Sequence, residues 1–98
     1  MSKMNATPAS VRWLEDIPNV GKAVAEILRR IGIHAPAQLA GRDPFELYAE
    51  FNAVSGICND PCLLDTFIAT TRFMGGEPAR PWWAYTAERK ARLGNRKD

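Results

Sequence analysis

Several features that mark large classes of protein are scarce in this 98-residue chain. It has no apolar run close to the ~20 residues that a membrane-spanning helix needs, and residues 1–10 lack the apolar segment of a signal peptide. Two cysteines and one histidine are too few for a disulfide framework or a four-ligand zinc site. Alternation of apolar and polar residues is never long enough to predict a β-strand. We therefore expect a cytoplasmic protein with no membrane segment and no metal held by side chains.

The charge of the chain is balanced rather than one-sided. Lys and Arg number 13 against 11 Asp and Glu, and the net charge of +2 is too weak to predict nucleic-acid binding on its own. A hydrophobic content of 46% is ordinary for one globular domain. We expect a flexible N-terminal lead over residues 1–10, a single domain over residues 11–93 and a basic tail over residues 94–98.

Helical periodicity is the main positive signal. The clearest helix has an apolar face with residues at i, i+3, i+4 and i+7, namely Val24, Ile27, Leu28 and Ile31. Val24 and Leu28 are therefore expected in the core, and Gly32 supplies a C′ position that tolerates positive φ. Residues 11–15 predict a short first helix that ends ahead of Pro18, because residues before proline avoid the α region.

Two further helices have matching start signals. Asp43-Pro44 and Asp60-Pro61 each place a capping residue before a proline at the first helical position, and Glu46 matches a capping box. Gly56 and Gly75-Gly76 are the expected ends. The expected buried faces consist of Leu47, Tyr48, Phe51 and Val54, and of Leu64, Phe67, Ile68 and Thr71. Shorter helices are expected at residues 36–40 and 86–93. The predicted fold class is all-α, a compact bundle of about five short helices.

The stretch DIPNVGKAVAEILRRIGI, residues 16–33, places a tight turn directly before the amphipathic helix. A turn of the form apolar-Pro-x-apolar-Gly between two helices resembles the helix-hairpin-helix DNA-binding motif of SAM-like folds. The matching residues are Ile17, Pro18, Asn19, Val20 and Gly21, followed by Ala23, Ala25, Leu28, Ile31, Gly32 and Ile33. Asn19 stands where that family usually has glycine, and asparagine enters the left-handed region more easily than other non-glycine residues.

The resemblance implies a phosphate-binding site at this turn. Gly21 has no Cβ to keep a phosphate away, and it opens a helix whose first N–H groups lack internal partners. Lys22 adds a positive charge nearby. The implied DNA-contacting residues are Asn19, Val20, Gly21, Lys22, Ala23 and Val24, with the amides of Asn19, Gly21, Ala23 and Val24 as donors. The family often holds a monovalent cation in the hairpin, so Na⁺ or K⁺ would bind the backbone carbonyls of Glu15, Ile17 and Val20.

The same turn also has an interpretation without any ligand, because a Pro-x-x-Gly link is a common αα-hairpin. We expect a non-catalytic module that binds DNA phosphates weakly and independently of sequence. The alternative is a protein–protein adaptor in which the hairpin is only structural. The charges beside the hairpin do not agree on which function is correct. Lys22 and Arg12 favour phosphate binding. The acidic residues nearby oppose it: Glu15, Asp16 and Glu26.

A wider resemblance covers residues 13–89. The segments IPNVGKAVA, LAGRDPFELY, DPCLLDTF, FMGG and PWW are similar to small bacterial helix-hairpin-helix proteins of the pathogenicity-locus and mitomycin-resistance-like family. The C-terminal domain of TfoX-type competence regulators is a more distant likeness. DNA-bound members of this motif class usually pair two hairpins, and SGICNDPCLLDTFI is at most a degenerate second one.

No constellation of side chains indicates catalysis. No serine or cysteine has a histidine base at a recognisable spacing. The carboxylates are interpreted as caps and surface charges: Glu15, Asp16, Asp43, Asp60 and Asp65. Cys62 lies in the first turn of a helix, where a thiol pKa tends to fall, but a buried and inert pair with Cys58 is the favoured interpretation. His34 is expected at the surface.

Trp82 and Trp83 form an adjacent aromatic pair. One member of such a pair usually packs into the core while the other faces solvent or a partner. Exposed rings near basic residues would stack on nucleic-acid bases. Closing the back of the bundle is the alternative role, and it is the favoured one. The basic residues concerned are Arg80, Arg89, Lys90 and Arg92.

Overall fold

The computed structural model describes residues 3–92, and no β-strand occurs in that range. The α-helices are α1 (Lys22–Arg30), α2 (Pro44–Ser55), α3 (Pro61–Met74) and α4 (Thr86–Arg92). Short 3₁₀ helices lie between and before them: η1 (Lys3–Asn5), η2 (Pro8–Ser10), η3 (Leu14–Asp16), η4 (Pro36–Leu39) and η5 (Trp82–Tyr85). The all-α prediction is confirmed. Leu93 and the predicted basic tail over residues 94–98 lie outside the described residues.

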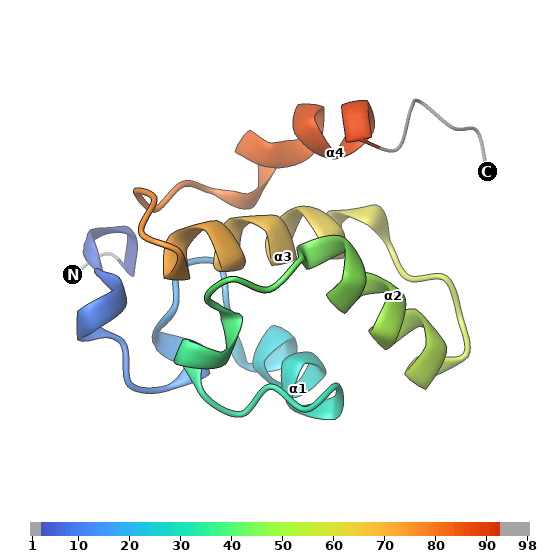
Figure 1. Cartoon of the computed structure of the whole chain (residues 1–98), viewed down its shortest axis with the longest axis horizontal. Helices are drawn as coiled ribbons and strands as arrows, with labels where there is room; N and C mark the ends of the chain where they lie inside the picture. Colours follow the sequence, from blue (N-terminus) through green and yellow to red (C-terminus); the bar gives the residue numbers. More distant parts are fainter. Residues whose placement is uncertain (1–2, 93–98) are drawn as a thin grey trace.

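Helix α3 runs through the middle of the molecule, with α4 on one side and α1 and α2 on the other (Figure 1). It is buried along most of its length, including three threonines that an apolar environment would otherwise disfavour. Their hydroxyls donate to carbonyls of the same helix: Thr66 to Cys62, Thr70 to Phe67, and Thr71 to Phe67 and Ile68. Because each hydroxyl has an acceptor, these polar side chains are tolerated in the core.

The helix boundaries follow the predicted capping signals. The Asp43 carboxylate accepts the Phe45 N–H at 2.9 Å, and the Asp60 carboxylate accepts the Cys62 N–H at 2.8 Å. Gly56 ends α2 with a φ of 75°, a left-handed conformation that glycine adopts without strain. Within residues 3–92, every helix is too short or too polar to cross a bilayer.

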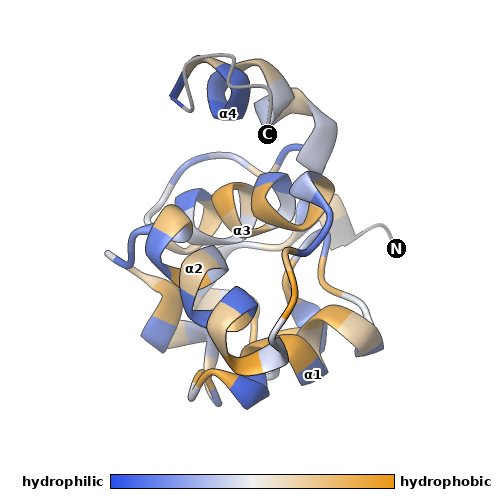
Figure 2. Ribbon diagram, turned by 90° about the vertical axis from the view of Figure 1, so that its right-hand side faces the viewer, coloured by the Kyte–Doolittle hydropathy of each residue, from blue (hydrophilic) through white to orange (hydrophobic). Residues whose placement is uncertain are grey.

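The main core joins the turn region to α1, α2 and α3. Its buried residues are Leu14, Ile17, Val20, Ala25, Leu28, Ile33, Leu39, Leu47, Phe67 and Phe73. A second cluster, formed by Leu64, Ile68, Ala69 and Tyr85, connects α3 to η5. In Figure 2 the hydrophobic colour is gathered on α1 to α3, and α4 has little of it. Leu28 is fully buried as predicted, whereas Val24 is half-buried and packs against the edge of the main core.

Two sequence predictions about local structure were wrong. The short helix predicted over residues 11–15 is instead the 3₁₀ helix η3 over Leu14–Asp16, and residues 11–13 are not helical, because Asp16 accepts the N–H groups of Arg12 and Trp13 ahead of it. Val54 was expected in the core but is 52% exposed. It lies in the last turn of α2, which diverges from α3 in Figure 1, so only the earlier Leu47 and Phe51 are buried.

A third correction concerns Asp65, which was interpreted as a cap or surface charge. Its side chain is completely buried on α3 and is bound by two residues of α4. The Arg89 Nε donates to Asp65 Oδ1 at 2.8 Å, and the Thr86 hydroxyl donates to Asp65 Oδ2 at 2.7 Å. A buried carboxylate needs such partners, so this pair joins α4 to the rest of the fold.

Candidate nucleic-acid interface

Residues 17–20 form the tight turn before α1. The Val20 N–H donates to the Ile17 carbonyl at 3.0 Å, and Asn19 has a φ of 73°. A four-residue turn with proline at its second position and a left-handed residue at its third is a type II turn. The expectation that asparagine adopts the left-handed region is confirmed. Ile17 and Val20 are fully buried, so the core fixes both ends of the turn.

Gly21 caps the start of α1 in an extended conformation, with φ −97° and ψ −170°. Gly21 does not adopt positive φ, and the left-handed residue of the turn is Asn19. A Cβ added to Gly21 would meet nothing within 4 Å. Neither backbone strain nor packing within the described residues therefore requires glycine here, and the surface over the Gly21 backbone is open.

The first turn of α1 presents backbone donors at this open surface. The Gly21 carbonyl accepts the Ala25 N–H at 3.0 Å, and no side chain of the described residues caps the helix start. The N–H groups of Lys22, Ala23 and Val24 precede the first internal helix bond, and Lys22 and Ala23 are exposed. A helix start of this kind is suited to an anion.

Val20 differs from the other five predicted DNA-contacting residues. Its side chain is buried and its N–H closes the turn, so its place in the turn is internal. The Ile17 carbonyl that accepts this N–H is also one of the three carbonyls predicted to bind Na⁺ or K⁺. The cation site stays a prediction.

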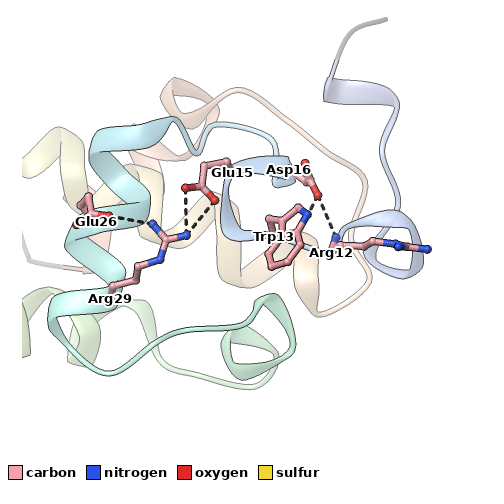
Figure 3. A network of polar contacts seen from close by, with 6 residues as sticks. All are labelled: Arg12, Trp13, Glu15, Asp16, Glu26 and Arg29. Carbon is pink, nitrogen blue, oxygen red and sulfur yellow. Dashed lines mark hydrogen bonds and ion pairs between the residues drawn. The ribbon is translucent and has the colours of Figure 1, made fainter.

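Three carboxylates lie beside the turn, and each is engaged by the protein itself (Figure 3). The Arg29 guanidinium contacts both oxygens of Glu15 at 3.0 Å and also binds Glu26 at 3.0 Å. Asp16 accepts the N–H groups of Arg12 and Trp13 at 3.1 and 3.0 Å. Each carboxylate is thus held by contacts within the protein, and Arg29 balances one of the three negative charges.

The titration of this cluster agrees with its geometry. Hydrogen bonding to its own backbone, followed by the Arg29 guanidinium, lowers the pKa of Glu15 below its ordinary value. The same contact with Glu15 raises the pKa of Arg29. The pair is therefore charged at neutral pH, and its net contribution to the field at the turn is small.

The two cations nearest the turn in sequence, Lys22 and Arg12, form no ion pair within residues 3–92. Within residues 3–92, the ion pairs of arginine involve Arg29, Arg42, Arg72 and Arg89. Lys22 and Arg12, which the sequence favoured as phosphate contacts, take part in none of them, and both are exposed. They are available to an external anion.

The structure adds a connection that sequence reasoning missed. The Asn19 side chain binds a segment more than sixty residues away: its Nδ2 donates to the Arg80 carbonyl at 2.7 Å, and its Oδ1 accepts the Trp82 N–H at 3.1 Å. The loop before η5 is thereby fixed beside the turn. The only sequence signal was that the side chain of Asn19 stands where the motif usually has glycine.

The tryptophan pair lies in this connected segment. Trp82 is half-buried against the second cluster, whereas Trp83 is 63% exposed. Their rings meet edge to face, with centroids 5.6 Å apart. The prediction that one ring packs while its neighbour faces solvent is confirmed.

The two cysteines differ from expectation. Both Cys58 and Cys62 are free and exposed, so the prediction of a buried pair was wrong. A hydrogen bond to the Asp60 carboxylate raises the pKa of the Cys62 thiol, which reverses the lowering expected at a helix start. The Asp60 carboxylate that caps α3 lies next to the thiol, so its negative charge also disfavours the thiolate. Among residues 3–92, no group of three or more His, Cys, Asp or Glu side chains is arranged to hold a metal ion.

Comparison with known proteins adds a family assignment. The chain is 51% identical over 80 residues to a protein of Streptomyces lavendulae named mitomycin resistance protein McrB, an alignment covering 82% of this chain and 76% of that protein. No solved structure matches the chain. The TfoX likeness stays a prediction. The family described as "Pathogenicity locus", Cdd1, matches residues 7–91. Since this match covers most of the chain, the protein belongs to the pathogenicity locus family.

Proposed function

We propose that this protein is a non-catalytic DNA-binding module that contacts the phosphate backbone through a helix-hairpin-helix turn. The contact would be made by residues 19–24, with backbone N–H groups as donors and Lys22 as the adjacent cation. Such contacts carry no sequence information, so binding would be independent of sequence. It would also be weak, in a range of about 10⁻⁶ to 10⁻⁴ M at physiological salt, as is typical of non-specific binding.

The observation that carries this proposal is the open backbone at Gly21. A glycine in an ordinary extended conformation, with free space where its side chain would be, is not needed by the fold. It leaves room for an external group to approach the start of α1. The helix start and the exposed Lys22 make an anion the favoured group.

The charge arrangement supports the same function. Glu15 and Glu26 bind Arg29, and Asp16 binds backbone N–H groups, so each carboxylate near the turn is held by contacts within the protein. Lys22 and Arg12 have no such carboxylate partner among the described residues. These two exposed cations offset the negative charge that Arg29 leaves on the neighbouring carboxylates, and they are the groups that would meet a phosphate.

The test is a binding titration by fluorescence anisotropy, with labelled single-stranded, duplex and branched DNA over a range of salt concentrations. We expect affinity to fall as salt rises, because bound cations release counterions from the phosphates. Lys22→Ala should reduce the slope of log K against log salt by about one. Lys90→Ala is the matched control, since it removes one exposed charge from α4, on the far side of α3 from α1.

Two outcomes would contradict the proposal. Equal losses in the two lysine variants would mean that binding follows net charge rather than the turn. Folded protein without measurable affinity for any DNA form at low salt would instead favour the alternative, a protein–protein adaptor in which the hairpin is only structural.

A further inference from the structure

Asn19 connects the phosphate-binding turn to an exposed aromatic side chain. Both ends of its amide are hydrogen-bonded to the loop that leads into η5, at Arg80 and Trp82. Trp83 follows Trp82 directly, and adjacent Cα atoms are about 3.8 Å apart. The backbone of Trp83 is therefore held one residue from the Asn19 contact, beside the turn that leads into α1.

The surroundings of Trp83 suit it to receive a flat ligand. Trp82 is anchored on one side by the Asn19 hydrogen bond and on the other by packing against Leu64, Ile68 and Tyr85. The rings of Trp82 and Trp83 meet edge to face, at an interplanar angle of 84°, and Trp83 is 63% exposed. A large apolar ring held in place and left open is a stacking surface.

We propose that Trp83 and the Asn19–Lys22 turn together form a binding site for single-stranded DNA, in which the indole stacks on an unpaired base while the turn holds a neighbouring phosphate. Asn19 acts as a positioning residue that sets the distance between the two contacts. Arg80, whose backbone carbonyl binds Asn19, is exposed and takes part in none of the ion pairs of residues 3–92. This inference rests on the proposed function and names its substrate class.

The proposal predicts discrimination against duplex DNA. Base faces inside a duplex are already stacked on each other, so an aromatic side chain reaches them only where the strand is unpaired. Phosphates, in contrast, are available in both forms. The turn alone would bind single-stranded and duplex DNA similarly, and Trp83 would add a preference for the single strand.

The experiment compares two labelled single strands of equal length, an oligothymidine and the same backbone with abasic residues. Both carry the same phosphates, and only the first has bases to stack. For the wild-type protein we expect the oligothymidine to bind about 5- to 140-fold more tightly, the range for one stacked base. Trp83→Ala should bring that ratio close to one while affinity for the abasic strand and its salt slope stay unchanged.

Three further variants separate stacking from other effects. Trp83→Phe keeps an aromatic face and should restore part of the ratio. Trp13→Ala removes an equally exposed tryptophan, 68% exposed, and should leave the ratio at its wild-type value. Lys22→Ala should weaken binding to both strands by the same factor, because it removes a phosphate contact only.

Asn19→Gly tests the positioning role. Glycine adopts the φ of 73° without strain, so the turn is kept while both hydrogen bonds to the loop are lost. The ratio of the two affinities should fall although Trp83 is still present, and helix content by circular dichroism should not change.

The failure of this inference differs from the failure of the proposed function. Binding of equal strength to the oligothymidine and the abasic strand, or a ratio unchanged in Trp83→Ala, would overturn the stacking site alone. Absence of binding to both strands at low salt would overturn the phosphate-binding function with it. An equal loss of the ratio in Trp13→Ala would show general adhesion of exposed indoles and would also overturn the site.

Discussion

At the scale of single residues, Gly21 is a glycine that the fold does not require. Its backbone is extended, and a side chain there would project into open space. Most glycines at sharp turns are retained for a left-handed φ, but in this turn Asn19 has that conformation. A substitution at Gly21 therefore changes the approach to the backbone more than the backbone itself.

We expect Gly21→Val to weaken DNA binding about tenfold or more, roughly the loss of one hydrogen bond to a charged group. Helix content should stay unchanged. Stability should fall by at most about 1 kcal/mol, because valine is a poorer helix cap than glycine. Anisotropy titrations and circular dichroism measure the two effects separately. Gly21→Ala should lie between wild type and Gly21→Val, and wild-type affinity in the valine variant would contradict phosphate contact at this amide.

At the scale of secondary-structure elements, the buried faces of α1 and α2 are unequal. Periodicity predicts Leu28 on α1 and Val54 on α2 as core residues alike. The first is fully buried and the second is 52% exposed, because the last turn of α2 diverges from α3. An amphipathic pattern shows which face of a helix is apolar but not how far the neighbouring helix covers it.

This difference predicts two distinct losses of stability. Leu28→Ala should lower the free energy of unfolding by about 2–5 kcal/mol, the cost of removing a buried side chain and leaving a cavity. Val54→Ala should change it by no more than about 0.5 kcal/mol, as is usual for an exposed position. Urea denaturation of both variants measures these values. Similar losses would mean that the α2 end is covered in solution.

The contact between α3 and α4 contains two ion pairs, the partly exposed Arg72–Glu88 and the buried Asp65–Arg89. Asp65 is completely buried, and Arg89 and Thr86 supply its hydrogen bonds. The Arg42–Glu50 pair has the same chemistry but is partly exposed on both sides. The ion pairs of Asp65 and Arg42 therefore differ in burial, which the sequence does not reveal.

Arg89→Ala should destabilise the protein by about 3–5 kcal/mol, because it leaves a buried carboxylate without its cation. Arg42→Ala, the matched control, should cost about 0–1 kcal/mol, since an exposed pair contributes little. Denaturant unfolding of both variants provides the comparison. If the Arg89 variant lost no more than the control, the carboxylate of Asp65 would have to be solvated or neutral.

At the scale of the whole molecule, stability should depend on acid through carboxylates whose pKa values are lowered. Bonding to its own backbone and to Arg29 lowers the pKa of Glu15 from 4.5, and the Cys62 N–H lowers that of Asp60 from 3.8. A lowered folded pKa means that the stabilisation is present above the unfolded value and is lost as pH falls through the folded value. We therefore expect unfolding to become easier below about pH 4.5.

Thermal unfolding at a series of pH values from 7 to 3 checks this expectation. Glu15→Gln and Asp60→Asn should each be less stable than wild type at neutral pH and should lose less on acidification. Asparagine still caps a helix, so the α3 start is retained in the second variant. Parallel pH profiles for wild type and both variants would show that neither carboxylate is linked to folding.

Much of this protein is determined by local sequence alone. The caps Asp43 and Asp60, the left-handed Asn19 and the helix end at Gly32 were predictable because each depends on a few neighbouring residues. The family could be predicted for the same reason, since the turn and its flanking motifs are short contiguous patterns. Where local hydrogen bonds compete, as when Asp16 holds Arg12 and Trp13 extended, even a local prediction failed.

The candidate site depends on contacts that no local pattern contains. Asn19 bonds to Arg80 and Trp82 across more than sixty residues, and this places Trp83 beside the turn. Asp65 became a buried ion-pair partner and Val54 an exposed side chain through the way that α4 and α2 lie against α3. Short-range sequence determined the turn and its backbone donors. Only the packing of distant segments decided which charges form ion pairs and which aromatic residue follows the segment bound by the turn. The reason is that burial and long-range hydrogen bonds exist only in the folded chain.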